Sequence, residues 1–200
     1  MKKNLKFIII GAVLILIVLG YYYYIANIRK PKEPEPETTK PSVVRELLAR
    51  DLSNDYPPTP KEVAKYYADI TTAFYTEDYS DEEFVSLALK LQQLYDAELV
   101  ANTPSDQYIN NLRSEILLYK ESGIVISSYA TSSSADVFYF DQDGRSWARL
   151  NIAFTVKQER NVGLAKETFV LRKDENKHWK IYGWAVAGNE EEGGNDDGED

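Results

Sequence analysis

The hydrophobic pattern divides the chain into one continuous apolar run, then segments with helical spacing, then segments with alternating spacing. The apolar run covers residues 7–28 and contains no charged side chain. At about 1.5 Å rise per residue, a helix of this length spans about 33 Å and can cross the hydrocarbon core of a bilayer. The run therefore predicts a transmembrane anchor that contacts membrane lipid.

The end of this run carries four consecutive tyrosines, Tyr21, Tyr22, Tyr23 and Tyr24. Tyrosine prefers the membrane interface, where its ring is buried and its hydroxyl is hydrated, so these residues are expected at the interface. A cleaved signal peptide is the main alternative, but Tyr24-Ile25-Ala26 is a poor cleavage site. N-terminal sequencing of the native protein distinguishes the two.

The orientation of the anchor cannot be predicted from flanking charge, because three basic residues lie on each side of the run. The run follows a tail of only six residues, 1–6, as in a signal anchor that is never cut. Such segments usually leave the short end in the cytoplasm. We therefore expect a single-pass protein of the plasma (inner) membrane with most of the chain extracytoplasmic.

Two further segments have compositions that do not favour a packed core. Residues 29–42 alternate prolines with charged residues, which favours an extended spacer between the membrane and the rest of the chain. Residues 188–200 are acidic and glycine-rich, with no apolar side chain to bury, and are predicted to be disordered.

Residues 43–187 are predicted to form the folded domain, and its first half has helical spacing. Apolar residues at this spacing predict a short helix near 43–52 and three longer helices after Thr59, Ser80 and Thr103. Thr59 and Ser80 can cap their helices, each with a glutamate three residues later. Gly123 is expected to end the last helix.

From Ile124 onward the pattern changes to the alternation of β-strands. Strands are predicted at 124–131, 135–141, about 145–157, 167–173 and 178–186, with turns at 141–144, 161–163 and 174–177. Short connections favour an antiparallel meander. The fold class is therefore α+β, with three to four helices packed on one face of a curved antiparallel sheet of about four to five strands.

Several sequence stretches resemble known families. The ending Phe169 to Asp174 followed by Trp179-Lys180-Ile181, after three helices, is similar to the nuclear-transport-factor-2-like (cystatin-like α+β cone) domain of exported bacterial proteins. Residues 60–75 and 94–99 resemble an uncharacterised family of membrane-anchored bacterial proteins with this domain. The resemblance implies the cone fold but not one activity, because cones of this kind include enzymes, ligand binders and assembly scaffolds.

Composition excludes several kinds of chemistry. The chain has no cysteine, which excludes disulfides and thiolate nucleophiles, and one histidine, which excludes a multi-histidine metal site. Its formal net charge of −9 argues against nucleic acid as a partner. The stretch 141–144 resembles part of a calcium loop, but position twelve would be Leu150, so no metal site and no cofactor are predicted.

Candidate functional residues are few. His178 and Asp136 are weak catalytic candidates, because no carboxylate falls clearly at an inward-facing strand position. The large aromatic side chains of the sheet could line a pocket or a partner surface and are the candidate binding residues: Tyr139, Trp147, Tyr182 and Trp184.

The expected function is therefore a membrane-tethered, extracytoplasmic binding or assembly module without enzymatic activity. Its partner would be another envelope protein or a small apolar ligand. One alternative is an assembly component of a conjugation or type IV secretion-like complex, which has the same order of segments. The other is a pocket enzyme of hydrolase or isomerase type.

Overall fold

The computed structural model describes residues 42–187. The tail at 1–6, the predicted anchor at 7–28 with Tyr21 to Tyr24, the spacer up to residue 41 and the acidic segment 188–200 lie outside the described residues. Within 42–187, none of the helices combines the length and the apolar character required to cross a membrane.

The first half of the described chain consists of helices, as expected. They are α2 (Val43–Ala49), α3 (Pro60–Thr76), α4 (Asp81–Leu94), α5 (Ala97–Ala101) and α6 (Ser105–Glu121). Residues 42–187 thus contain five α-helices rather than the expected three to four. The additional helix is α5, whose five residues are too short to show a periodic apolar face.

Two of the predicted helix starts, at Thr59 and Ser80, are confirmed by their caps, whereas α6 has Pro104 at its N-cap and no side-chain cap. The Thr59 side chain accepts a hydrogen bond from the Glu62 N–H at the start of α3. Ser80 and Glu83 form a reciprocal capping box at the start of α4, which satisfies two backbone donors that the helix itself cannot pair. Gly123, with a φ of 66°, follows the end of α6 and adopts the left-handed conformation that glycine permits.

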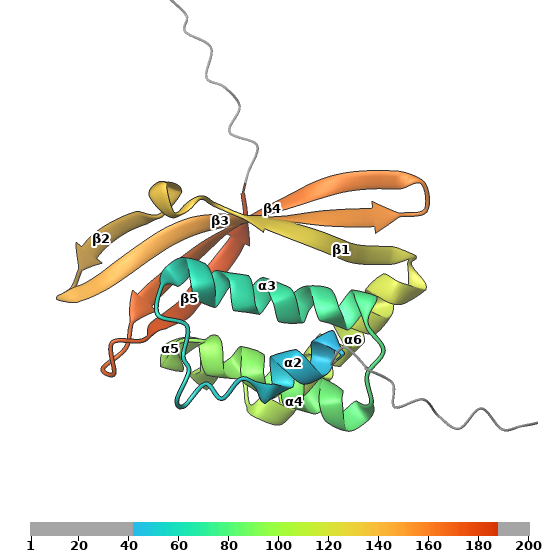
Figure 1. Cartoon of the computed structure of the whole chain (residues 1–200), viewed down its shortest axis with the longest axis horizontal. Coiled ribbons are helices and arrows are strands. Elements are labelled where there is room, and N and C mark those ends of the chain that lie inside the picture. The colour runs from blue at the N-terminus through green and yellow to red at the C-terminus, as the bar shows by residue number, and fades with distance from the viewer. Residues whose placement is uncertain (1–41, 188–200) are drawn as a thin grey trace, which may run out of the picture. The chain divides into compact units, whose positions relative to one another are not determined.

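The second half forms a five-stranded antiparallel sheet, which confirms the α+β class. Its strands are β1 (Ile124–Thr131), β2 (Phe138–Gln142), β3 (Arg145–Gln158), β4 (Asn161–Lys173) and β5 (Trp179–Val186). The expected meander is correct from β2 to β5 but wrong for β1, which pairs with β3 instead of β2. β1 lies along residues 152–158 of β3 and β2 along residues 145–149, so both occupy one edge of β3 (Figure 1).

Two strand boundaries also differ from the prediction. Residues 134–136 form a short 3-10 helix, and β2 starts only at Phe138. β4 starts at Asn161, so the predicted turn at 161–163 is wrong. The chain turns instead at Glu159 and Arg160, where Glu159 has a φ of 53°. The turn was predicted at 161–163 because glycine is common in turns. Gly163 instead pairs with Val156 and belongs to β4.

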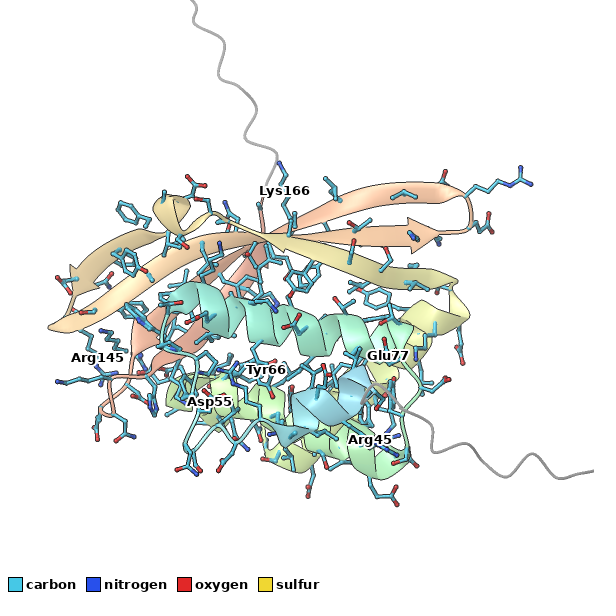
Figure 2. All side chains as sticks on the ribbon, viewed as in Figure 1. Arg45, Asp55, Tyr66, Glu77, Arg145 and Lys166 are labelled. Atoms are coloured by element: carbon cyan, nitrogen blue, oxygen red, sulfur yellow. The ribbon has the colours of Figure 1, made fainter. Side chains whose placement is uncertain are left out.

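All of the helices cover the same face of the sheet (Figure 1). α3 packs against β1, β3 and β5, while α4 and α6 pack around α3. The largest fully buried side chains come from both layers and include Ile70 and Phe74 of α3, Leu91 and Leu94 of α4, and Ile152 and Phe169 of the sheet. Because the helices cover one face only, the other face of the sheet is open to solvent; Figure 2 shows Lys166 extending outward from it.

A buried ion pair and a backbone hydrogen bond join the start of α5 to β4 and β5. The Asp96 N–H donates to the Ile181 carbonyl of β5 at 2.8 Å. The Arg172 guanidinium donates to both oxygens of the Asp96 carboxylate, at 2.8 and 2.6 Å. A third hydrogen bond from Arg172 reaches the Glu98 carboxylate at 2.7 Å. These contacts fix the position of α5, which forms one wall of the site described next.

Candidate functional site

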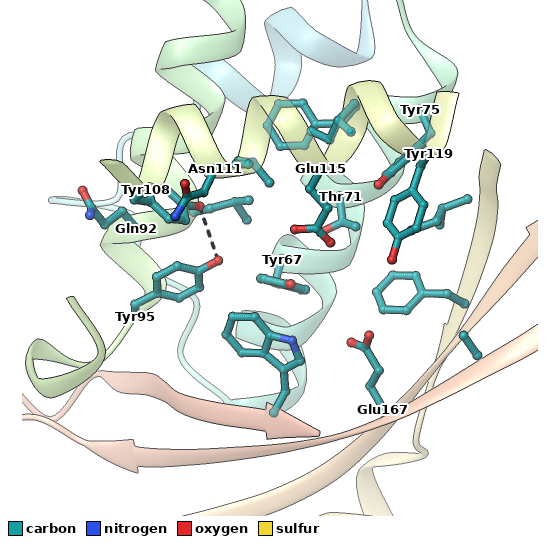
Figure 3. A pocket seen from close by; sticks show the side chains of 18 of the residues that line it. Tyr67, Thr71, Tyr75, Gln92, Tyr95, Tyr108, Asn111, Glu115, Tyr119 and Glu167 are labelled. Carbon is teal, nitrogen blue, oxygen red and sulfur yellow. Dashed lines mark hydrogen bonds between the residues drawn. The ribbon is translucent and has the colours of Figure 1, made fainter. Parts of the chain in front are cut away.

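A cavity of about 570 Å³ lies between the helices and the inner face of the sheet. This volume is in the range that accommodates a small molecule. Its lining comes from α3, α4, α5 and α6 on the helical side and from β1, β3, β4 and β5 on the other (Figure 3). Most of the lining side chains are aromatic or aliphatic, and those used below are Tyr67, Tyr75, Tyr95, Tyr108, Leu112, Glu115, Ala165, Glu167 and Trp184.

An aromatic group forms one wall of the cavity. The Trp184 ring lies 5.7 Å from both the Tyr67 and the Tyr95 rings, measured between centroids. On the sheet it stacks against Phe169, with 5.9 Å between centroids and an angle of 15° between the planes. Phe169 is fully buried, whereas Trp184 is 40% exposed. Trp184 therefore has a rigid support behind it and a free face toward the cavity.

Tyrosine hydroxyls supply most of the neutral polar groups. The Tyr95 and Tyr108 hydroxyls lie 3.4 Å apart and connect the end of α4 to α6 (Figure 3). Burial raises the pKa of Tyr108 to about 12 and that of Tyr95 well above its usual value. Burial also raises the pKa of Tyr67 and Tyr75. These hydroxyls stay protonated and neutral at physiological pH, so they can donate hydrogen bonds to a ligand.

Two carboxylates reach into the cavity from opposite sides. Figure 3 shows Glu115 extending from α6 and Glu167 from β4, with the two carboxylate groups directed toward each other. Glu115 is exposed and Glu167 is partly buried. Burial, followed by the negative charge of Glu115, raises the pKa of Glu167 above its usual 4.5. No lysine, arginine or histidine of residues 42–187 is among the cavity-lining residues.

Glu167 occupies the inward-facing position at which no carboxylate was expected. Its side chain belongs to the same face of β4 as the buried Phe169 and Leu171, two and four residues further on. That alternation is visible in the sequence, because the predicted strand 167–173 already contains Glu167 at the same parity as Phe169 and Leu171. On α6, Glu115 follows Leu112 at helical spacing, so the same periodicity places it beside the cavity.

Of the four aromatic binding candidates, only Trp184 lines the cavity. Trp147 is buried, stacks on Phe140 and donates its indole N–H to the Gln142 carbonyl. Tyr182 packs edge-on against Trp147, and the Arg172 guanidinium lies 4.7 Å from the Tyr182 ring centroid. Tyr139 is 55% exposed and contacts Trp179. Trp147 and Tyr182 therefore pack against the guanidinium of the ion pair, whereas Tyr139 packs against Trp179.

The two weak catalytic candidates also lie outside the cavity lining. Asp136 is exposed in the 3-10 helix. The His178 ring stacks on Tyr56, with 4.3 Å between centroids, and its Nδ1 lies 4.0 Å from the Asp174 carboxylate. The structure therefore does not bring Asp136 and His178 together. Across residues 42–187, no three acidic or histidine side chains are grouped so that they could hold a metal ion.

The fold and the site together define an α+β protein with a one-sided helical layer over an aromatic cavity that contains two carboxylates. The chain belongs to the family defined by a domain of unknown function, DUF6715, whose model matches residues 1–184. This confirms the expectation of an uncharacterised family. No curated protein matches the chain.

Proposed function

We propose that this protein is a membrane-tethered, extracytoplasmic binding module whose cavity holds a small, mostly apolar ligand. Residues 7–28 would anchor the chain in the membrane, and residues 29–42 would separate the binding domain from the bilayer. The domain would be a variant of the nuclear-transport-factor-2-like cone. The module acts by binding rather than by catalysis.

The cavity is the observation that carries this proposal. A single-sided α+β layer of this size could fill the space between helices and sheet with side chains, as protein interiors do. Here about 570 Å³ stays open next to Trp184, which is 40% exposed although a buried ring supports it. An accessible aromatic cavity with a few polar groups is the usual form of a small-molecule site.

Two properties of the sequence support the tether. Residues 7–28 are uncharged and long enough to span the hydrocarbon core, and Tyr21 to Tyr24 suit the interface. The family match begins at residue 1, so this segment belongs to the sequence that defines the family. Attachment to a membrane would concentrate the binding domain where apolar ligands partition.

Filling the cavity tests the proposal directly. Ala165 lines the cavity, and phenylalanine at this position would occupy part of it. The matched control is Ala153→Phe: Ala153 pairs with Lys166 in the neighbouring register position and faces the other side of the sheet. Binding of phenylbutanol to the full chain in phosphatidylcholine nanodiscs is measured by calorimetry, with empty nanodiscs as the reference. Ala165→Phe should weaken binding at least tenfold and Ala153→Phe should not; equal binding by both variants would contradict the proposal.

A pocket enzyme is the second candidate, because a carboxyl group with a raised pKa inside a cavity is suited to proton transfer. Glu167 is the group in question, while Asp136 and His178 lie elsewhere. Any turnover that depends on Glu167 and survives substitution of Asp136 and His178 would favour this alternative. Stable co-purification with a secretion complex would favour the assembly role instead.

A further inference from the structure

We infer that the ligand is an organic cation, a protonated amine with an apolar body, whose charge lies between Glu115 and Glu167 and whose body packs against Trp184, Tyr67 and Tyr95. This inference rests on the proposed binding function and specifies the class of ligand.

The first argument is the uncompensated charge of the cavity. Among residues 42–187, no side chain or backbone group donates a hydrogen bond to the Glu115 or Glu167 carboxylate, and neither forms an ion pair. Some acidic groups elsewhere are compensated: Asp96 and Asp81, for example, are both paired with arginines. Two carboxylates that face each other across an apolar space repel, and a monocation between them relieves the repulsion.

The second argument concerns the aromatic rings. Outside the cavity, lysine and arginine side chains lie over ring faces repeatedly, as Lys180 does over Tyr56 at 4.3 Å and Arg113 over Phe84 at 4.4 Å. Within residues 42–187, no such cation lies over any ring that lines the cavity. The Trp184 ring, which is 40% exposed and has Tyr67 and Tyr95 packed beside it, is therefore available to an incoming cation, which aromatic rings attract.

The same features disfavour other ligands. A fatty acid or another anion would meet two carboxylates and no basic group, so its binding would be penalised. A bare metal ion needs several oxygen ligands in place of its water, and the described residues bring no suitable group of three together. An amine needs only one or two carboxylates together with apolar and aromatic contacts, which is what the cavity contains.

The test compares three ligands that share one skeleton: phenylbutylammonium, phenylbutanol and phenylbutanoate. Their affinities for the full chain in phosphatidylcholine nanodiscs are measured by calorimetry at neutral pH against empty nanodiscs. The ammonium ion should bind at least tenfold more tightly than the alcohol, and the carboxylate should bind most weakly. The preference for the ammonium ion over the alcohol should largely vanish in the Glu115→Gln/Glu167→Gln variant. The affinity of this variant for the alcohol should change less than threefold.

The matched control is Glu121→Gln/Glu175→Gln, which removes the same charge from exposed positions outside the cavity lining. This control variant should keep the preference for the ammonium ion over the alcohol. The shift of the thermal midpoint that each ligand causes is a second measurement of binding in the same variants. Binding of the ammonium ion should also weaken as the pH falls and Glu167 takes up a proton, except where position 167 is Gln. If amine and alcohol bind equally, or if the preference survives in the cavity variant, the inference fails while the binding function stands. If none of the three ligands binds, both fail.

Discussion

The guanidinium of Arg172 and the carboxylate of Asp96 form a buried ion pair with two hydrogen bonds, of 2.8 and 2.6 Å. The two residues are only 7% and 3% exposed. Asp96 is at the same time the cap of α5, since its side chain accepts the Glu98 N–H, and its own N–H binds β5. A single carboxylate thus joins β4, β5 and the helix that forms one wall of the cavity.

Removing one member of this pair should be costly. Asp96→Ala leaves a buried guanidinium without its main partner, so the free energy of unfolding should fall by about 3 kcal/mol. Glu98→Gln changes a carboxylate whose side chain is 61% exposed and should cost less than about 1 kcal/mol. Urea unfolding curves measure both. Asp96→Leu combined with Arg172→Met should recover much of the loss; no recovery would show that the pair has a role beyond mutual compensation.

The ion pair between Arg172 and Asp96 should also make the stability of the protein depend on pH in the acidic range. Burial alone would raise the pKa of the Asp96 carboxyl, but hydrogen bonds from Arg172 and from the Glu98 N–H hold it below its usual 3.8. A carboxyl whose pKa is lower in the folded state contributes stability above about pH 4 and loses that contribution as the pH falls through the folded value. Asp96→Asn should therefore destabilise strongly at pH 7 and much less at about pH 2. Equal destabilisation at both values would contradict this account.

Glu167 should have the opposite pH dependence. Its pKa is raised above 4.5 by burial and by Glu115, so folding favours the protonated form. The contribution of Glu167 to the free energy of unfolding is therefore fully present below about pH 4.5 and is lost as the pH rises through the pKa of the folded state. Glu167→Gln should then raise the thermal midpoint at pH 7 to 8 and change it little near pH 4. Glu121→Gln, on the exposed part of α6, should not show this pH-dependent difference.

The β2–β3 hairpin offers a test of its turn. Asp143 and Gly144 both have positive φ, 52° and 71°, as in a type I′ turn. Gly144→Ala should cost about 1 kcal/mol because of its backbone conformation alone, since nothing lies within 4 Å of an added Cβ. Gly163→Ala is the matched control: it has the same free space without a positive φ and should be neutral or slightly stabilising. Thermal unfolding of both variants gives the comparison.

The proposed topology can be tested with a single reactive side chain. The natural sequence has no cysteine, so Ser133→Cys would introduce a unique thiol at an exposed position next to the 3-10 helix. A membrane-impermeant maleimide should label it in right-side-out vesicles and fail to do so in inverted ones. Asn4→Cys should give the reverse pattern. Labelling of Ser133→Cys only in inverted vesicles would overturn the extracytoplasmic placement.

The fold was largely predictable because its signals are local. Capping residues such as Ser80 and the alternation from Ala148 to Phe154 depend on near neighbours in the chain, and these boundaries are confirmed. The pairing of β1 with β3 was missed because it depends on α3 packing beneath both strands. α5 was missed because five residues held by Asp96 have no periodic pattern of their own.

The cavity was less accessible from the sequence than the fold. Trp184 was identified from its residue type, but Trp147 and Tyr182 have the same character and pack around Arg172 instead. What separates them is the strand face and the bulge at Val170 and Leu171, which shifts the register of β5. The Glu115 and Glu167 pair could not be read from spacing alone, because it depends on the tertiary arrangement that places α6 and β4 on opposite sides of one cavity.

The shared edge of β3 has a consequence for how the chain can vary. β1, together with α3 and α6, builds the cavity side of the sheet, whereas β2 pairs with the other half of β3. Between them, residues 133–136 are exposed and belong to neither strand. Relatives could lengthen or shorten the chain here, or acquire an inserted module, while the cavity keeps its form.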